Sequence, residues 1–293
     1  FLNSAMNKIS TTEGKIRLNW CNYINNFGDE LSPYLIKKLT GHPVEYSNSK
    51  ENTLYAIGSI LNFDSLHSQN IIWGSGTLHK HSLDILPKIF PIKRNFLTAF
   101  KRIRTKKENS YICSVRGPLT RQAIISHNIP CPELYGDPAI LIRRHFSPNF
   151  EPLHKAGLIL HYTQSQILPD SLQKGNKLNI ISMKCTSDKE IENCISTICQ
   201  CEKIYSTSLH GLIIAQTYGI PAQWVQIKNF RIHINQEHKF LDYFYGVKAP
   251  VQKPIVISLD NLDQLLDVEP TKYIISDSTI DKLHDAFPFE LLE

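Results

Sequence analysis

The first forty residues change from a strand-like to a helix-like hydrophobic pattern. Apolar residues alternate with polar ones over residues 15–23, which is typical of a strand. From Asp29 or Glu30 onward they recur at helical spacing, and this pattern stops at Gly41, a residue that commonly ends helices. The start of the chain therefore predicts a strand, a polar connection and a helix.

The same alternation continues through the first half of the chain. Apolar runs, most of them followed by a glycine turn or a helix-like pattern, predict four further strands. These are residues 53–57, 70–73, 111–115 and 134–135. Because strands that alternate with helices pair in parallel, we expect a doubly wound sheet that ends near residue 145.

A second alternating region follows the proline-rich stretch 145–152, which has the composition of a linker. It predicts strands at 156–161, 178–182, 203–205 and 223–227, with helices at 187–201 and 209–218. Residues 260–293 are predicted to be helical and to pack on either domain. The fold class is therefore α/β, with two Rossmann-like domains, residues 1–148 and 149–293, facing a central cleft.

Composition narrows the class of protein. With 293 residues, 42% of them hydrophobic, the chain can bury a large core. No long apolar run follows Met6, so neither a signal peptide nor a membrane span is expected. Seven cysteines without C-x-x-C spacing favour a reducing cytoplasm over disulfides or a zinc site.

Positive charge is concentrated between Lys93 and Lys107, with aromatic and aliphatic residues interleaved. Such a basic amphipathic segment can form a solvated face, lie on an anionic membrane surface, or bind a polyanion. No RNA-binding or helix-turn-helix signature is present, so nucleic acid is not an expected partner.

The most informative stretch is residues 203–221, a short strand, a polar turn and a helix that opens at Ser208 or Leu209. This places His210 at a helix N-terminus, beside the hydroxyls of Ser206 and Thr207. Unpaired N–H groups and a partial positive charge at this end favour an anion such as phosphate. The alternative is an ordinary serine cap with His210 hydrogen-bonded to backbone.

Polar turns also follow strands of the first domain, where ligands bind in open parallel sheets. Between Asn26 and Glu30, Gly28 permits a close backbone approach, and Asp29 is an acid, a base or a simple N-cap. The turn Gly74-Ser75-Gly76-Thr77 can present N–H groups to an anion, but it is too short for a dinucleotide fingerprint.

Two further turns carry charged residues. Arg116 precedes Gly117-Pro118 at a strand end, where its guanidinium suits bidentate binding of phosphate or carboxylate. The alternative is an ion pair with Asp137, which itself either orients a basic partner or only shapes its turn.

The second domain adds a polar stretch after its last predicted strand. Arg231, His233, His238 and Lys239 would face the same cleft, or else form surface charge. Motifs of serine hydrolases, P-loop NTPases and zinc proteases are absent, as is a carboxylate pair with glycosidase spacing.

Taken together, five motifs resemble the polysaccharide pyruvyltransferase family in order and spacing, from about Leu18 to Tyr245. They are Asn26-Phe27-Gly28-Asp29, Gly74-Ser75-Gly76-Thr77, Ser114-Val115-Arg116-Gly117-Pro118, Tyr135-Gly136-Asp137-Pro138-Ala139 and Ser208-Leu209-His210-Gly211. The resemblance implies a glycosyltransferase-B-like fold. It also implies transfer of enolpyruvyl from phosphoenolpyruvate to two sugar hydroxyls, giving a cyclic pyruvate ketal in capsular, exopolysaccharide or cell-wall glycans.

The resemblance assigns roles to particular residues. Arg116 and Leu209-His210 match positions used around phosphoenolpyruvate, whereas Ser208 stands where many members have arginine, and Lys239 or Arg231 is a candidate for that charge. Expected catalytic residues are His210 as acid or phosphate ligand, Arg116 as donor anchor and Asp29 as base. Expected substrate-binding residues are Asn26, Gly28, Gly74, Ser75, Gly76, Thr77, Asp137, Ser206, Ser208, Leu209, Gly211, Arg231 and Lys239.

In this reading the first domain is the acceptor side and the second the donor side, with no metal or cofactor. If the acceptor is a lipid-linked sugar, residues 93–107 would hold the enzyme at the inner membrane face. The alternatives are a nucleotide-sugar glycosyltransferase of the same architecture and a non-catalytic protein that binds glycans or polyanions.

Overall fold

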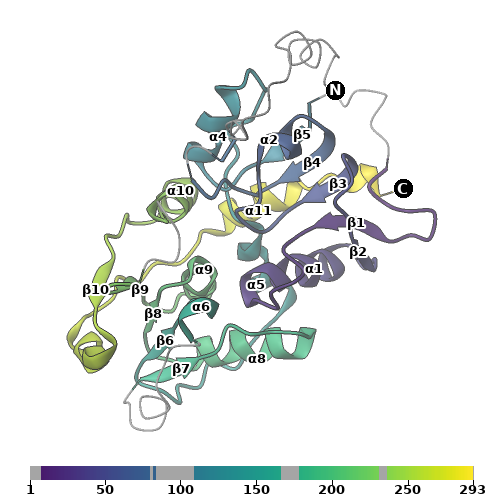
Figure 1. Ribbon diagram of the computed structural model, residues 1–293. Helices are drawn as coiled ribbons and strands as arrows, with labels where there is room; N and C mark the ends of the chain where they lie inside the picture. Colours follow the sequence, from purple (N-terminus) through teal and green to yellow (C-terminus); the bar gives the residue numbers. More distant parts are fainter. Residues whose placement is uncertain (1–7, 80–81, 84–108, 166–177, 231–235, 293) are drawn as a thin grey trace.

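A computed structural model describes residues 8–79, 82–83, 109–165, 178–230 and 236–292. Its strands form two five-stranded parallel sheets, one from each half of the chain (Figure 1). Two Rossmann-like α/β halves are therefore confirmed, while the central cleft and the glycosyltransferase-B assignment stay predictions. The basic stretch at 93–107 lies outside the described residues.

The first sheet has the strand order β2-β1-β3-β4-β5. Its strands are β1 (Ile16–Asn19), β2 (Val44–Tyr46), β3 (Glu51–Tyr55), β4 (Gln69–Trp73) and β5 (Tyr111–Ser114). All four neighbouring pairs are parallel, as the alternation with helices predicts. The strand predicted at 134–135 is reduced to one bridge between Tyr135 and Val115.

The second sheet has the order β10-β9-β8-β6-β7, again with every pair parallel. Its strands are β6 (Gly157–Ile159), β7 (Asn179–Ile181), β8 (Ile204–Ser206), β9 (Ala222–Ile227) and β10 (Ile255–Ile257). The short edge strands β2 and β10 were not predicted, because three residues are too few for a recognisable alternation.

Helices and 3-10 turns connect the strands. They are α1 (Phe27–Thr40), α2 (Phe63–Leu66), α4 (Pro118–Ile125), η1 (Pro138–Leu141), α5 (Ile142–His145), α6 (Tyr162–Ser165), α8 (Asp188–Cys199), α9 (Leu209–Thr217), α10 (Glu237–Val247), η2 (Leu259–Asp267), α11 (Asp277–Asp285) and η3 (Phe289–Leu291). Helix α1 ends at Gly41, whose φ of 73° is readily adopted by glycine. Helix α9 is buried on almost every side, so it lacks a polar face.

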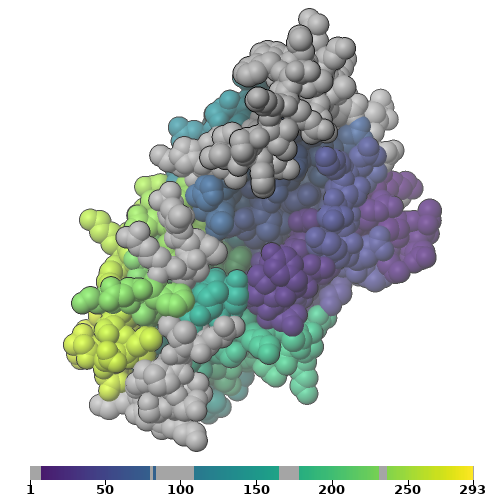
Figure 2. Space-filling model, in the orientation of Figure 1, coloured from purple at the N-terminus to yellow at the C-terminus, as the bar shows by residue number. Residues whose placement is uncertain are grey.

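The two halves share buried surface. One hydrophobic cluster contains Leu31 and Leu35 of α1 together with Ile213 of α9 and Phe244 of α10. Figure 2 shows purple segments of the first half directly against teal and green segments of the second. The halves are thus packed together rather than merely linked.

The C-terminal tail returns to the first half. It is helical only in η2, α11 and η3, with extended connections between them, so the prediction of a helical tail holds in part. Trp73 Nε1 donates a hydrogen bond to the Leu283 carbonyl at 2.8 Å, and Ile9 N donates to the Leu291 carbonyl at 3.0 Å. The boundary predicted at 148/149 stays a prediction.

Across the described ranges, none of the helices combines the length and apolar character that a membrane crossing requires.

Candidate active site

The predicted site motifs lie at the carboxyl ends of strands in both sheets. Residues 26–29 follow β1, residues 74–77 follow β4, Arg116 follows β5, and residues 208–211 follow β8. Backbone hydrogen bonds from Phe27 N to Met183 O (2.7 Å) and from Cys185 N to Asn25 O (2.9 Å) hold the first of these loops against the second half. Motifs far apart in sequence therefore meet between the halves.

His210 lies in the first turn of α9, packed against the start of α1. A Cβ atom at position 28 would collide with the His210 imidazole, so glycine is needed there for the ring to fit. The His210 side chain is 14% exposed, and its Nε2 lies 3.5 Å from Asp137 Oδ2. Ser208, the N-cap of α9, makes no side-chain cap hydrogen bond, which argues against an ordinary serine cap.

Asp137 is fully buried and lies on the other side of the imidazole, beside Nε2. Its Oδ1 accepts a hydrogen bond from Ala139 N at 3.1 Å, which caps η1. Neither Asp137 Oδ2 nor His210 Nε2 has a hydrogen-bond partner in the described ranges. Unsatisfied buried polar atoms of this kind call for an explanation. The anticipated alternative pair of Arg116 with Asp137 is not formed.

Asp29 is a partly buried carboxyl group whose pKa is raised by its surroundings. Asn26 Nδ2 donates a hydrogen bond to Asp29 Oδ2 at 2.9 Å. Burial raises the pKa of Asp29, while Asn26 and the charges of His210 and Lys239 oppose that rise. A carboxyl group whose pKa is raised toward neutrality can exchange a proton during a reaction.

Lys239 contributes a buried ammonium group from α10. The residue is 8% exposed, and Nζ has no recorded hydrogen bond or ion pair within the described residues, although it lies 5.8 Å from the Phe240 ring centroid. Burial and the charge of Arg116 lower the pKa of Lys239 to about 8, against the opposing effect of Asp29. An ammonium group without an oxygen partner is a ready anion ligand.

Arg116 is buried and fully engaged with protein groups. Its Nε donates to Asp242 Oδ2 (3.2 Å), Nη1 to Ser59 Oγ (2.5 Å) and Nη2 to the Thr77 carbonyl (2.6 Å). A Cβ atom at position 76 would press on this guanidinium, which explains Gly76. Direct contact between Arg116 and a donor stays a prediction.

The remaining predicted residues have structural partners. Gly74 has a φ of 79° and packs on Pro138, and Ser75 Oγ donates to the Gly58 carbonyl at 3.0 Å. Ser206 Oγ accepts from Ser208 N at 3.1 Å, and Gly211 packs on the same Oγ. Leu209 is buried in the core. Arg231 and His233 lie outside the described residues.

Sequence reasoning missed Asp242. It lies on α10, a helix that was not predicted, and it pairs with Arg116 across 126 positions of sequence. No local sequence motif predicts a partner so distant in the chain.

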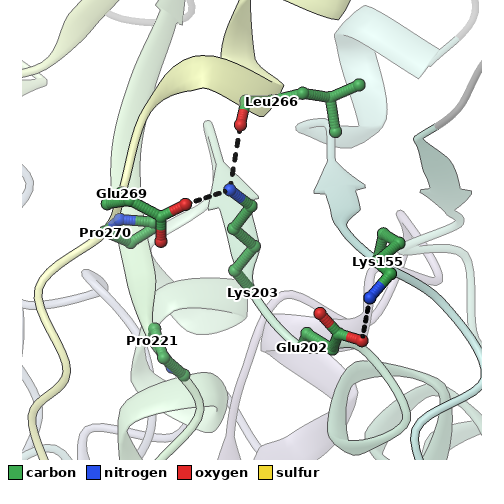
Figure 3. A pocket seen from close by; sticks show the side chains of 7 residues that line it. All are labelled: Lys155, Glu202, Lys203, Pro221, Leu266, Glu269 and Pro270. Atoms are coloured by element: carbon green, nitrogen blue, oxygen red, sulfur yellow. Dashed lines mark hydrogen bonds and ion pairs between the residues drawn. The ribbon is translucent and has the colours of Figure 1, made fainter.

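A surface cavity of about 530 Å³ lies elsewhere, at the amino ends of β6, β8 and β9 (Figure 3). It is lined by Lys155, Glu202, Lys203, Pro221, Leu266, Glu269 and Pro270. Its charged groups are satisfied: Lys203 Nζ donates to the Leu266 carbonyl (3.0 Å) and to Glu269 (2.8 Å), and Lys155 pairs with Glu202 (2.9 Å). This cavity is on the opposite edge of the sheet from the motifs.

The described residues include no group of three or more histidine, cysteine or acidic side chains that could hold a metal ion.

Comparisons with known proteins agree with the motif pattern. The model of the family described as polysaccharide pyruvyl transferase matches residues 26–228, more than half of the chain. A search of curated proteins finds similarity to the uncharacterized protein L143 of Acanthamoeba polyphaga mimivirus, 26% identical over 149 residues. That match covers 50% of this chain and 51% of the viral protein, so the chain spans about half the length of the curated relative it matches.

Proposed function

Because the chain belongs to the polysaccharide pyruvyl transferase family, we propose that it transfers the enolpyruvyl group of phosphoenolpyruvate to two hydroxyls of a sugar. The product is a cyclic pyruvate ketal in a bacterial surface polysaccharide or its lipid-linked precursor, and phosphate is released. The proposal extends the family assignment to a donor, a product and a set of residues.

The observation that carries the proposal is the place of His210. Its imidazole is enclosed by Gly28 and Asp137 of the first half, while α9 of the second half supplies the residue itself. Histidine is the commonest general acid and base in enzymes, and this one lies where motifs of both halves meet. The family motifs of both halves therefore converge on one proton-transfer group.

The donor phosphate and carboxylate need positive charge. Ser208 supplies none where many family members have arginine, but the buried Lys239 ammonium, whose charge acts on Asp29, has no oxygen partner within the described part of the chain. Backbone N–H groups in the first turn of α9 add partial positive charge in the same place. Lys239 is thus our candidate for the missing donor-binding cation.

The chemistry balances with these groups. His210 gives a proton to the methylene carbon of phosphoenolpyruvate, and the resulting oxocarbenium carbon is attacked by one sugar hydroxyl, whose proton passes to Asp29. A second hydroxyl then displaces phosphate and closes the ketal ring, with phosphate leaving together with that hydroxyl's proton. A raised pKa suits Asp29 to hold the first proton.

The acceptor and the location are part of the proposal. We place the sugar on the side of the first half, next to Asp29, and the enzyme in the cytoplasm. A lipid-linked acceptor would be reached through peripheral contact of residues 93–107 with an anionic membrane.

A thermal-shift titration with phosphoenolpyruvate tests the proposal, since a ligand that binds the folded state raises the melting temperature. We expect saturable stabilisation of the wild-type protein that is weakened in His210→Ala and Lys239→Met. No response to phosphoenolpyruvate, with stabilisation by a nucleotide sugar, would instead indicate a glycosyltransferase. A response to neither donor would favour a non-catalytic glycan- or polyanion-binding protein.

A further inference from the structure

Helix α10 crosses from the second half of the chain onto the turn that begins α4 (Figure 1). Two glycines make this approach possible. A Cβ atom at position 117 would collide with the Asp242 carbonyl, and one at position 246 would collide with the Arg116 carbonyl. The two backbones are therefore in direct contact at this crossing.

Asp242 is the group that joins them. Its Oδ1 accepts hydrogen bonds from Leu119 N (2.9 Å) and Thr120 N (3.0 Å), and its Oδ2 accepts from Thr120 Oγ1 (2.6 Å) and Arg116 Nε (3.2 Å). The N-cap residue of helix α4 is Gly117, which has no side chain that could cap the helix. Asp242 thus caps α4 from the other half of the chain and neutralises Arg116.

The same face of α10 carries Lys239. Residues three and four apart lie on one side of a helix, so Lys239 and His238 are one turn before Asp242. His238 Nε2 is hydrogen-bonded to Thr77 Oγ1 at 2.9 Å. The turn that bears Lys239 is consequently fastened to the first half at both of its ends, by His238 and by Asp242.

We propose that Asp242 is a positioning residue, which fixes Lys239 at the candidate active site by tying α10 to the first turn of α4. Its link to donor binding rests on the proposed function, in which Lys239 contacts phosphoenolpyruvate. The proposal also gives a reason for the Arg116-Gly117 motif and for Gly76, since all three build the surface on which α10 docks.

A second link between the halves provides a matched control. Lys37 Nζ of α1 lies 2.6 Å from Asp188 of α8, but these side chains are 39% and 47% exposed. Exposed pairs contribute little, because water solvates both charges and the side chains lose entropy. Asp188 is therefore an acid that also bridges the halves without touching the candidate site.

The first experiment needs no substrate. In Asp242→Asn the amide oxygen can still accept from the α4 backbone, but the amide nitrogen opposes Arg116 Nε, so the end of α10 should loosen. We expect acetic anhydride to label Lys239 about tenfold faster than in the wild type, as measured by peptide mass spectrometry. Labelling of exposed Lys189 should be unchanged, and Asp188→Asn should leave Lys239 protected. An unchanged Lys239 rate in Asp242→Asn would overturn the proposal.

The second experiment uses transfer kinetics. We expect Asp242→Asn to raise KM for phosphoenolpyruvate about tenfold with kcat within threefold, and Asp242→Glu to recover part of the loss. A purely structural role would lower kcat and the melting temperature together at constant KM, which would contradict the proposal. Faster Lys239 labelling with unchanged KM would support positioning but remove Lys239 from donor binding. If Asp242→Asn does not fold, Thr120→Val makes the same test, since it removes the hydrogen bond to Asp242 Oδ2 together with the acceptor of Thr77 N.

Discussion

Lys203 and Lys239 are both lysines of the second half, and their surroundings differ. Lys203 lies in the cavity at the amino edge of the sheet, where its ammonium group donates to two carbonyls and to Glu269. The hydrogen bond to Glu269 is the main reason why the pKa of Lys203 is raised. Lys239 lies at the carboxyl edge with no oxygen partner among the described residues, and burial lowers its pKa to about 8.

The difference shows which lysine is prepared for a ligand. An ammonium group that already donates all its hydrogen bonds to protein oxygens stabilises the protein but has no donor free for an anion. An unsatisfied buried one costs stability in the free protein and regains it when an anion binds. The cavity around Lys203 is therefore a poorer guide to the candidate active site than Lys239, whose charge has no oxygen partner among the described residues.

The largest effect is expected from the removal of His210, which tests whether function lies at the carboxyl edge of the second sheet and not at its amino edge. His210→Ala takes away the proposed acid at the carboxyl edge, so kcat for transfer should fall 10²- to 10⁴-fold, the usual range for a lost general acid. The assay is phosphate release from phosphoenolpyruvate in the presence of a glycan acceptor.

His154 gives the matched control, since it is a histidine at the amino edge of the same sheet. His154→Ala should leave kcat unchanged. Comparable losses in both variants would mean that the two edges do not differ in function.

Lys239→Met should change stability and affinity in opposite directions. The pKa falls from 10.5 to about 8 on folding, which corresponds to about 3 kcal/mol of destabilisation at pH 7. Between pH 8 and 10.5 the unfolded chain retains a proton that the folded protein has lost, so wild-type stability from this group rises with pH. Urea unfolding should therefore show the methionine variant to be more stable at pH 7, with that advantage shrinking toward pH 10.5.

The same variant should bind the donor more weakly. A lost hydrogen bond to a charged group is worth about 1.5–3 kcal/mol, or roughly 10- to 100-fold in KM for phosphoenolpyruvate. Greater stability with an unchanged KM would show that Lys239 is strained for another reason.

Gly28→Ala probes the packing of His210 without removing it. The added methyl group collides with the imidazole, so either the ring or the start of α1 must move. We expect about a tenfold lower kcat, because a small misplacement of a catalytic group is costly. Gly41→Ala tests the opposite end of α1 as a control: position 41 has open space at Cβ but a φ of 73°, so the substitution should reduce stability and leave kcat unaffected.

The hydrophobic pattern of the sequence was sufficient to predict those strands and helices in which apolar residues recur at regular spacing. Strands β3, β4 and β5 and helices α1, α8 and α9 were predicted close to their observed bounds, because alternation and helix ends are local properties. The polar loops around Gly28 and His210 were also predicted at the carboxyl ends of strands, where ligands bind in open parallel sheets.

What sequence could not supply were contacts between distant segments. The pair of Arg116 with Asp137, one of the two roles expected for this arginine, is not formed, and Arg116 pairs with Asp242. That choice depends on where α10 docks, which is a property of the packed fold. The lack of an oxygen partner for Lys239 among the described residues could not be predicted either. It depends on every group that packs around the ammonium group in the fold.

The smallest effect is expected at the amino edge, for Lys203→Met. Glu269, its carboxylate partner, has a side chain that is 85% exposed, so water solvates the acid once the ammonium group is removed. The loss of the ion pair and the carbonyl contacts should cost about 1 kcal/mol in urea unfolding. Transfer rate and KM for phosphoenolpyruvate should stay at wild-type values, since the residue is on the far side of the sheet from His210. A raised KM would place the cavity on the substrate's path, and the satisfied lysine would then be the functional one.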